Sequence, residues 1–337
     1  MDLRYQWAKR EDTPLIQEFI REQFGADSIQ AASGRFDALF TEHPGGFHVA
    51  LCCFARRIVG VRCYLPARIV CCQQEYQAAF PIDLMVSPEF RRKGISSLFV
   101  DMALERFKAT VSSGQSTAQA AVYGKKKALI VAAYHKGYLV RRPSTSKGLK
   151  TTARDILSWV RWTVMNKPQI VNTDLNINDL NRIQNILSDR FGENDAGIAT
   201  SGELLAWRYA GSFYQDCRLA LLKIGEDSGV VAYRAKRDET QILDILCREK
   251  ALDNLIRAAA VGLPGNRITA IFAGERLAGR FAAAGFFVRP QEARLTVYTK
   301  DMVLRERLQL ADWKVFAGDS DTALREFPTE EEPCAIF

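Results

Sequence analysis

The segment DLMVSPEFRRKGISSL (residues 83–98) carries the most informative pattern in this chain. An apolar strand ends at Val86, a proline-containing turn with three cations follows, and Gly94 precedes an amphipathic helix expected over 95–107. The amide groups at a helix start, together with the helix dipole, attract anions. Glycine lets the backbone come close to a bulky ligand. The segment therefore predicts a turn that binds a pyrophosphate, with a solvated basic turn as the alternative.

The elements around this segment predict a mixed sheet flanked by helices. In residues 1–150 we expect strands over 3–8, 48–55, 58–64, 67–73, 78–86 and 120–123, and helices over 12–24, 95–107 and 127–135. A hairpin is expected around Arg56-Arg57, and the last helix is expected to end at Gly137, a residue suited to a left-handed cap. This order of elements is typical of a sheet covered by helices.

Three features of the first half recur in the second half in the same order. These are Phe-Gly after a helical pattern (24–25 and 191–192), an apolar strand with one acid (81–85 and 242–246), and glycine leading into a strand (137–141 and 285–289). A fixed order of recurring features predicts a duplicated unit. We therefore expect two domains, 1–150 and 151–337, joined by a helix over 151–165.

The second domain is expected to repeat the elements of the first. Its expected strands are 169–173, 217–223, 229–234, 240–247, 267–272 and 293–299, and its expected helices are 178–191, 251–262 and 275–284. Residues 245–254 contain no glycine, however, and Glu249 and Asp253 would repel phosphate. The pyrophosphate turn is therefore expected in the first domain alone.

The residues Arg91-x-x-Gly94-x-Ser96 resemble the R/Q-x-x-G-x-G/A turn of the GNAT N-acetyltransferase superfamily. The element order of residues 1–150 and the helix-to-strand step at Gly285 are also similar to that family. The resemblance covers nearly the whole chain as a tandem architecture. It implies an α/β (α+β) fold of two GNAT-like domains, each a mixed, mostly antiparallel sheet flanked by helices.

The resemblance implies acetyl-CoA as a cosubstrate, bound where two parallel strands splay apart. One strand would end near Val86, and the other would be 120–123. The pantetheine amides would pair with the backbone of Met85 and Val86. The pyrophosphate would lie on the turn and helix start, formed by Arg91, Arg92, Lys93, Gly94, Ile95, Ser96 and Ser97. No metal is expected.

Two residues are candidates for proton transfer in the reaction that the resemblance implies. Asp83 lies on the strand that would carry the acyl group, and its carboxylate could take a proton from an acceptor ammonium group. A structural role is the alternative, because Asp244 has the corresponding place in the second half. The family's acid tyrosine stands four residues before its glycine. Tyr134 stands three before Gly137 and is a candidate acid, with packing as the alternative.

The acceptor site is the least defined part of the sequence. Trp207, Arg208 and Tyr209 resemble a feature of bacterial GNAT-like proteins and are candidates to line an acceptor pocket. A core or interface role is the alternative for such aromatic residues. Without its own turn, the second domain is expected to shape the acceptor site or to brace the first domain.

Composition narrows the class of protein further. The 337 residues carry a net charge of +7, which fits an anionic ligand, and no block of five cations marks a nucleic-acid arm. No run of 18 apolar residues and no signal-peptide pattern occurs, so we expect a cytoplasmic protein without a membrane span. The eight cysteines form no C-x-x-C pair. Adjacent ones would point to opposite faces of a strand, which favours buried thiols over a zinc site.

The sequence thus predicts an N-acyltransferase that uses an acyl-CoA, with acetyl-CoA as the first choice, and acts on a small amine such as an amino sugar or an aminated metabolite. Because a thioester is already activated, direct transfer in a ternary complex is expected. The alternatives are a non-catalytic CoA-sensing module and a protein N-acetyltransferase. The sequence leaves a homo-oligomer open.

Overall fold

The computed structural model describes residues 2–113, 115–142, 153–164, 169–175, 189–210 and 217–319. The first-half elements are β1 (Arg4–Trp7), α1 (Thr13–Phe24), β2 (Val49–Phe54), β3 (Arg57–Cys71), β4 (Gln74–Val86), α2 (Ile95–Arg106), β5 (Ala109–Ser113), α3 (Thr117–Lys125) and β6 (Leu129–Val140). The hairpin expected around Arg56-Arg57 is confirmed. In it Ala55 and Arg56 have φ of 48° and 66°, the geometry that suits the twist of paired strands. The helices expected over 12–24 and 95–107 are also confirmed.

Two elements expected near the end of the first half are wrong. Residues 120–123 belong to helix α3, and residues 129–135 of the expected helix belong to strand β6. Strand β6 lies between two other strands of the sheet, and its sequence is a nearly continuous apolar run. The periodicity of such a run does not distinguish a buried strand from a buried helix. Gly137 caps no helix but lies within β6, where a Cβ atom would meet the ring of Phe272 at 3.3 Å.

The second-half elements are α4 (Ala153–Val164), β7 (Val171–Asp174), β8 (Asp195–Ala199), α6 (Gly202–Ala210), β9 (Cys217–Ile224), β10 (Asp227–Lys236), β11 (Glu239–Cys247), α7 (Leu252–Gly262), β12 (Arg267–Ala273), α8 (Glu275–Ala283), β13 (Phe287–Tyr298), α9 (Met302–Leu310), β14 (Asp312–Phe316) and the 3-10 turn η7 (Ala317–Asp319). The elements expected from 217 to 299 are confirmed. Strands β8 and β14 and helices α6 and α9 have no counterpart among the expected elements. Most of the helix expected over 178–191 lies outside the described residues.

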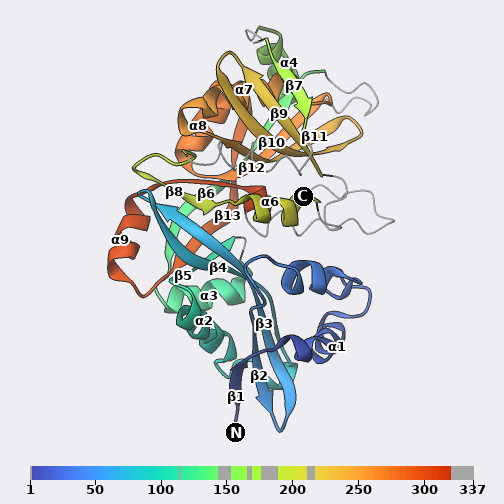
Figure 1. Cartoon of the computed structure of the whole chain (residues 1–337), viewed down its shortest axis with the longest axis vertical. Helices are drawn as coiled ribbons and strands as arrows, with labels where there is room; N and C mark the ends of the chain where they lie inside the picture. The colour runs from blue at the N-terminus through green and yellow to red at the C-terminus, as the bar shows by residue number, and fades with distance from the viewer. Residues whose placement is uncertain are drawn as a thin grey trace.

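The described strands join into one sheet in the order β1-β2-β3-β4-β5-β13-β6-β12-β11-β10-β9-β7, with β8 and β14 off this path. The sheet is mixed and mostly antiparallel, which confirms the expected fold class. Strand β13 of the second half lies between β5 and β6, and β6 of the first half lies between β13 and β12 (Figure 1). The halves have therefore exchanged strands, and the boundary near residue 150 stays a prediction.

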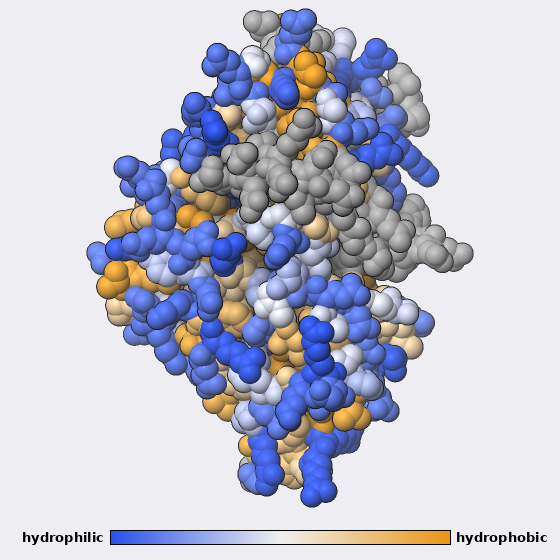
Figure 2. Space-filling model, in the orientation of Figure 1, coloured by the Kyte–Doolittle hydropathy of each residue, from blue (hydrophilic) through white to orange (hydrophobic). Residues whose placement is uncertain are grey.

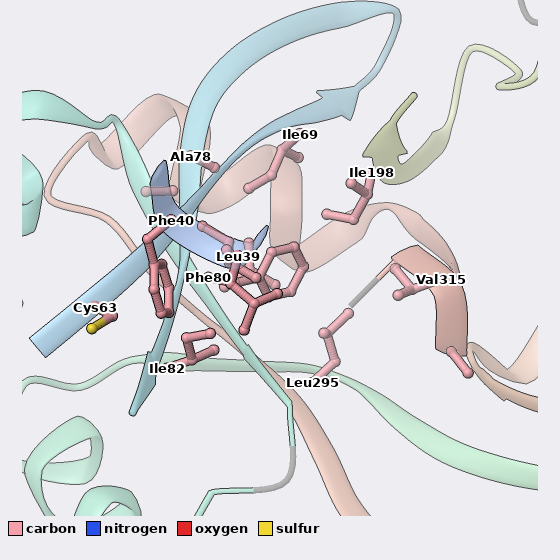
Figure 3. Packing of buried hydrophobic residues seen from close by; sticks show 14 of the residues in the cluster. Leu39, Phe40, Cys63, Ile69, Ala78, Phe80, Ile82, Ile198, Leu295 and Val315 are labelled. Carbon is pink, nitrogen blue, oxygen red and sulfur yellow. The ribbon is translucent and has the colours of Figure 1, made fainter. Parts of the chain in front are cut away.

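The largest apolar core also crosses between the halves. Figure 3 shows first-half side chains packed close to second-half ones, among them Leu39, Phe80, Ile82, Ile198, Leu295 and Val315. Leu39 comes from the helical turn η3 (Asp37–Thr41), and Val315 comes from β14. Burial of apolar surface is the main favourable term in folding, so this largest core stabilises the two halves together.

A fragment of residues 1–150 is expected to aggregate. It would leave β5 without β13 and β6 without β12 and β13, and unpaired apolar strand edges associate with other chains. Size-exclusion chromatography of the fragment beside the full chain measures this. A folded, monomeric fragment would show that the halves are independent.

Helix α9 leaves apolar side chains on the surface. Met302, Val303 and Leu310 are 71%, 62% and 79% exposed. Figure 2 shows apolar colour at the left edge, where Figure 1 places α9. Exposed apolar patches often mark protein contacts. The homo-oligomer considered from the sequence stays a prediction.

Candidate functional site

Strands β4 and β5 form a V-shaped splay. They run parallel and pair only through Ala78 with Ala109 and Ala79 with Thr110. Beyond these pairs β4 continues along β3, while β5 up to Ser113 pairs with β13 on its other edge. The splay has the form expected for the cosubstrate site, but its second strand is β5, and the expectation of 120–123 is wrong.

A β-bulge in β4 lies beside the splay. The β3–β4 register shifts so that Asp83 and Leu84 together oppose Arg62 alone. Asp83 has φ of 46°, a conformation that costs a non-glycine residue on the order of 1–3 kcal/mol. A bulge releases backbone groups from the ladder and is frequent beside active sites. The backbone of Met85 and Val86, expected to pair with the cosubstrate, follows directly.

The turn after β4 has the geometry expected for an anion site. A 3-10 turn, η4 (Pro88–Phe90), leads to Gly94, which has φ of 84° and directly precedes α2. A Cβ atom at Gly94 would meet no atom within 4 Å, so the space beside its backbone is open. Arg91 Nε donates to Val86 O at 3.1 Å, which ties the turn to the end of β4.

The charge and exposure of this turn also fit an anion. Residues 91–94 are exposed, whereas Ile95 is buried and anchors the first turn of α2. Ser97 and Leu98 donate their amides to Gly94 O, so the helix starts at this point. The cations of 91–93 and the helix amides therefore lie at the same end of α2. Binding by 91–97 stays a prediction.

Tyr123 of α3 lies at the apex of the splay and was missed in the sequence. Its hydroxyl shares a hydrogen bond of 3.3 Å with Oγ1 of Thr110, the last β5 residue that pairs with β4. Burial raises the pKa of Tyr123, so the hydroxyl is protonated at neutral pH. Tyr123 stands four residues before Lys127. Lys127 has φ of 53°, a left-handed conformation that glycine usually adopts. A left-handed conformation at a lysine leaves no mark in the sequence, so the spacing from tyrosine to glycine did not find Tyr123.

Tyr134 lies elsewhere. It is buried on β6, paired with Ala273 of β12, and belongs to the largest core cluster. In the sheet, β13 separates β6 from β5. The expectation that Tyr134 lies in a helix is wrong, and its role as an acid stays a prediction with packing as the alternative.

Asp83 forms a buried ion pair. Arg35 Nη1 lies 2.6 Å from Asp83 Oδ2, and the two side chains are 6% and 9% exposed. Arg35 follows α1 in the chain, so this pair holds the segment after α1 against the bulge. Asp83 therefore lies beside the splay with its charge compensated.

The second half contains a comparable pair. Its β10–β11 register also shifts, and Asp244 follows directly after the bulge. Arg190 Nη2 lies 2.8 Å from Asp244 and 3.0 Å from Asp319. Burial raises the pKa of Asp244 to about 7, although Arg190 opposes the shift. Both arginines precede a phenylalanine, so an Arg-Phe pair recurs with the bulge aspartate in each half.

Helix α6 carries the three acceptor candidates to the joint between the halves. Trp207 Nε1 donates to Ala38 O at 2.7 Å, and its ring lies 4.4 Å from that of His43. Arg208 and Tyr209 are both buried. Burial and then the charge of Arg208 lower the pKa of His43 to about 3. The contact of Trp207 with the first half supports the interface alternative, and an acceptor role for these residues stays a prediction.

The described residues contain no cluster of three or more metal-ligating side chains. One expectation about the cysteines is wrong, since Cys71 and Cys72 lie with their Sγ atoms 3.8 Å apart. Cys72 has φ of 50° in the turn after β3, so it does not alternate as a strand residue would. In the part of the chain that the structure describes, no helix is long and apolar enough to cross a membrane.

No protein-family model and no curated protein matches the chain. Solved structures with a similar fold include a protein of unknown function from Enterococcus faecalis described as a probable N-acyltransferase (TM-score 0.61, 12% identity, 89% of this chain and 72% of that chain). A GCN5-related N-acetyltransferase from Kribbella flavida is also similar (TM-score 0.60, 11% identity, 89% of this chain and 73% of that chain). So is Eis1 from Mycobacterium abscessus (TM-score 0.57, 9% identity, 91% of this chain and 76% of that chain). The splay, the bulge and the turn agree with this likeness. The chain has the fold of the GCN5-related N-acetyltransferases.

Proposed function

We propose that the chain is an acyl-CoA-dependent N-acyltransferase that transfers an acetyl group from acetyl-CoA to a small amine, such as an amino sugar or an aminated metabolite. The observation that carries this proposal is the splay between β4 and β5, which opens beyond Ala79 and Thr110. The bulge of β4 lies along one side of this splay, and the basic turn follows the end of β4. The likeness to N-acetyltransferase structures supports the same class of reaction.

The residues present fit an acyl-CoA. The backbone of Met85 and Val86 would pair with the pantetheine amides, because the splay leaves the β5-facing edge of β4 without β5 beyond Ala79. The pyrophosphate would lie on 91–97, where Gly94 leaves open space and the helix start supplies amides. The charges of Arg92 and Lys93 favour the same ligand.

Direct transfer requires a neutral amine and a leaving thiolate. The amine nitrogen attacks the thioester carbonyl, a C–N bond forms, and the C–S bond breaks with its electron pair on sulfur. Asp83 would take the proton from the acceptor ammonium group, directly or through water. Tyr123 would give its proton to the thiolate, because its hydroxyl lies at the apex of the splay, and the proton that the attacking nitrogen loses as the amide forms would restore the hydroxyl.

The cysteines near this site are poor nucleophiles. Burial raises the pKa of Cys63 well above its usual value, with the charge of Asp83 adding to the shift. Burial likewise raises the pKa of Cys52 and of Cys53. The thiolate is the reactive form of cysteine, so a covalent acyl-cysteine is disfavoured.

Isothermal titration calorimetry with acetyl-CoA is expected to show one site per chain. Two equivalent sites, or none, would contradict the proposal. Turnover is then followed by the release of free CoA with a panel of amines. Binding without turnover on any amine would identify a CoA-sensing module instead. A stable acetylated cysteine, detected by mass spectrometry with acetyl-CoA alone, would contradict direct transfer.

Tyr123→Phe is expected to lower turnover roughly tenfold, which is less than a general acid usually contributes, because a thiolate of ordinary pKa leaves without full protonation. The affinity for acetyl-CoA should stay unchanged. Because burial raises the pKa of Tyr123 above its usual value of about 10, wild-type turnover should fall only above that pH as Tyr123 loses its proton, and the variant should lack that fall. Tyr134→Phe is the matched comparison, since Tyr134 lies on β6. If only Tyr134→Phe lowers turnover, the acid belongs to Tyr134.

A further inference from the structure

The second half repeats the splay of the first. Strands β11 and β12 run parallel and pair only through Glu239–Ile242 with Arg267–Ala270. The β10–β11 bulge follows at Leu243, as the β3–β4 bulge follows the last pair of β4 and β5. A second cleft of the cosubstrate type is therefore built into the fold.

Strand β14 fills this second splay. It pairs antiparallel with Phe272 and Ala273, the β12 residues just beyond the last pair with β11. Strand β6 occupies the other edge of β12 from Arg267 to Ala273. A strand has only two edges, so β14 lies on the edge that faces β11. In the first half no described strand pairs with the corresponding edge of β5 beyond Thr110.

The turn η7 follows β14 and fills the second splay as far as the bulge of β11. Residues Ala317 to Asp319 are buried. A Cβ atom on Gly318 would lie 2.8 Å from the carbonyl oxygen of Leu243, the residue at the β11 bulge. Asp319 accepts the amide of Phe316 at 3.1 Å and pairs with Arg190 at 3.0 Å. The segment 312–319 is thus fixed in the place where a pantetheine arm would run.

The charges at the end of the two splays differ. The first-half turn presents three successive cations at the start of α2, whereas the stretch before α7 alternates Arg248, Glu249 and Lys250, and Asp253 lies in the first turn of α7. Lys314 of β14 supplies the opposite charge, since its Nζ contacts Glu249 and lies 2.5 Å from Asp195 Oδ2. The side chains of Lys314 and Asp195 are only 5% and 2% exposed. Buried charges need partners, so these contacts favour one fixed arrangement.

We propose that the segment 312–319 is an internal occupant of the second splay, which takes the place of an acyl-CoA and closes that splay permanently. The proposal rests on the proposed function, because it treats the first splay as the acyl-CoA site. The occupant also connects the halves, since β14 pairs with β8 and β8 pairs with residues 68–71 of β3. The second half thereby braces the hairpin that carries the bulge with Asp83.

Hydrogen–deuterium exchange of the full chain, with and without acetyl-CoA, tests this proposal. Residues 312–316 should exchange slowly in both states, and acetyl-CoA should protect 83–97 only. Faster exchange of 312–316 on ligand addition, or protection of 248–253, would overturn the proposal. Fast exchange of 312–316 in the free protein would overturn it as well. Unchanged exchange at 83–97 would refute the proposed function, while slow exchange at 312–316 would still support the closed second splay.

Lys314→Met is a second test that does not touch the first splay. It removes the buried cation between Asp195 and Glu249, so exchange at 312–316 should become faster and the Tm should fall. Lys300→Met is the matched control, because Lys300 forms an exposed ion pair with Asp101. Acetyl-CoA stoichiometry should stay at one in both variants. A second binding site in Lys314→Met would show that the occupant is displaceable and would overturn permanent closure.

Discussion

Gly94→Glu is expected to abolish acetyl-CoA binding. The substitution would place a carboxylate and its side chain in the open space beside the helix start, where the pyrophosphate would lie. Like charges repel most strongly at short range, and the same side chain would block access to the helix amides. The affinity should fall by at least 100-fold, measured by titration calorimetry, and turnover should fall with it.

Part of the loss of affinity in Gly94→Glu will come from strain in the backbone, so this prediction needs a control variant. Gly94 has φ of 84°, which strains any other residue. Gly25→Glu introduces the same residue at a glycine with φ of 91° and open space, away from the splay. With ψ of 151°, Gly25 lies in a region that is almost confined to glycine, whereas Gly94 with ψ of −1° is left-handed, so Gly25→Glu should lose at least as much stability but keep its affinity for acetyl-CoA. If Gly94→Glu keeps affinity within tenfold of the wild type, the pyrophosphate does not bind at this turn.

Asp83→Asn is expected to lower turnover by roughly 100-fold or more, the usual contribution of a general base. Acetyl-CoA affinity should change little, because the amide keeps the size of the carboxylate at the bulge. Turnover of the variant should recover at high pH, where more of the acceptor amine is already neutral. A pH profile of kcat from neutral to alkaline buffer measures this recovery.

Asp83→Asn also breaks the ion pair with Arg35, so this prediction needs a matched variant that separates loss of stability from loss of the base. Asp244→Asn removes the corresponding carboxylate in the second half, where Arg190 is the partner. Each variant leaves an arginine beside a neutral amide, so both should unfold at a lower temperature. The loss of turnover that recovers at high pH should occur in Asp83→Asn alone. Near-normal turnover of Asp83→Asn at neutral pH would make Asp83 structural, like Asp244.

The sequence predicted the turn at 91–97 because its signals are local. A strand end, a glycine with positive φ and a helix start lie within a few residues, so no distant contact was needed to identify them. The hairpin around Arg56-Arg57 was predictable for the same reason. The likeness to N-acetyltransferase structures confirms the fold that this resemblance implied.

The parts that the sequence did not reveal depend on distant contacts. β6 looked helical because β12 and β13 bury both of its edges and supply the environment for a continuous apolar run. Tyr123 was missed because Lys127, not glycine, adopts the left-handed conformation after α3. β14 is a five-residue strand whose place is fixed by its pairing with β12 and β8. No local pattern marks such a strand.

The position of β13 has a consequence for how the chain is made. Residues 295–298 supply a neighbour to residues 110–113, so the ribosome must finish most of the polypeptide before the N-terminal sheet is complete. At 5–20 residues per second, that interval is roughly 10–40 s. During it the edge of β5 stays without its partner, and nascent chains with such edges are substrates for chaperones. The yield of active protein in a cell should therefore depend on translation speed and chaperone supply more than the stability of the finished fold would suggest.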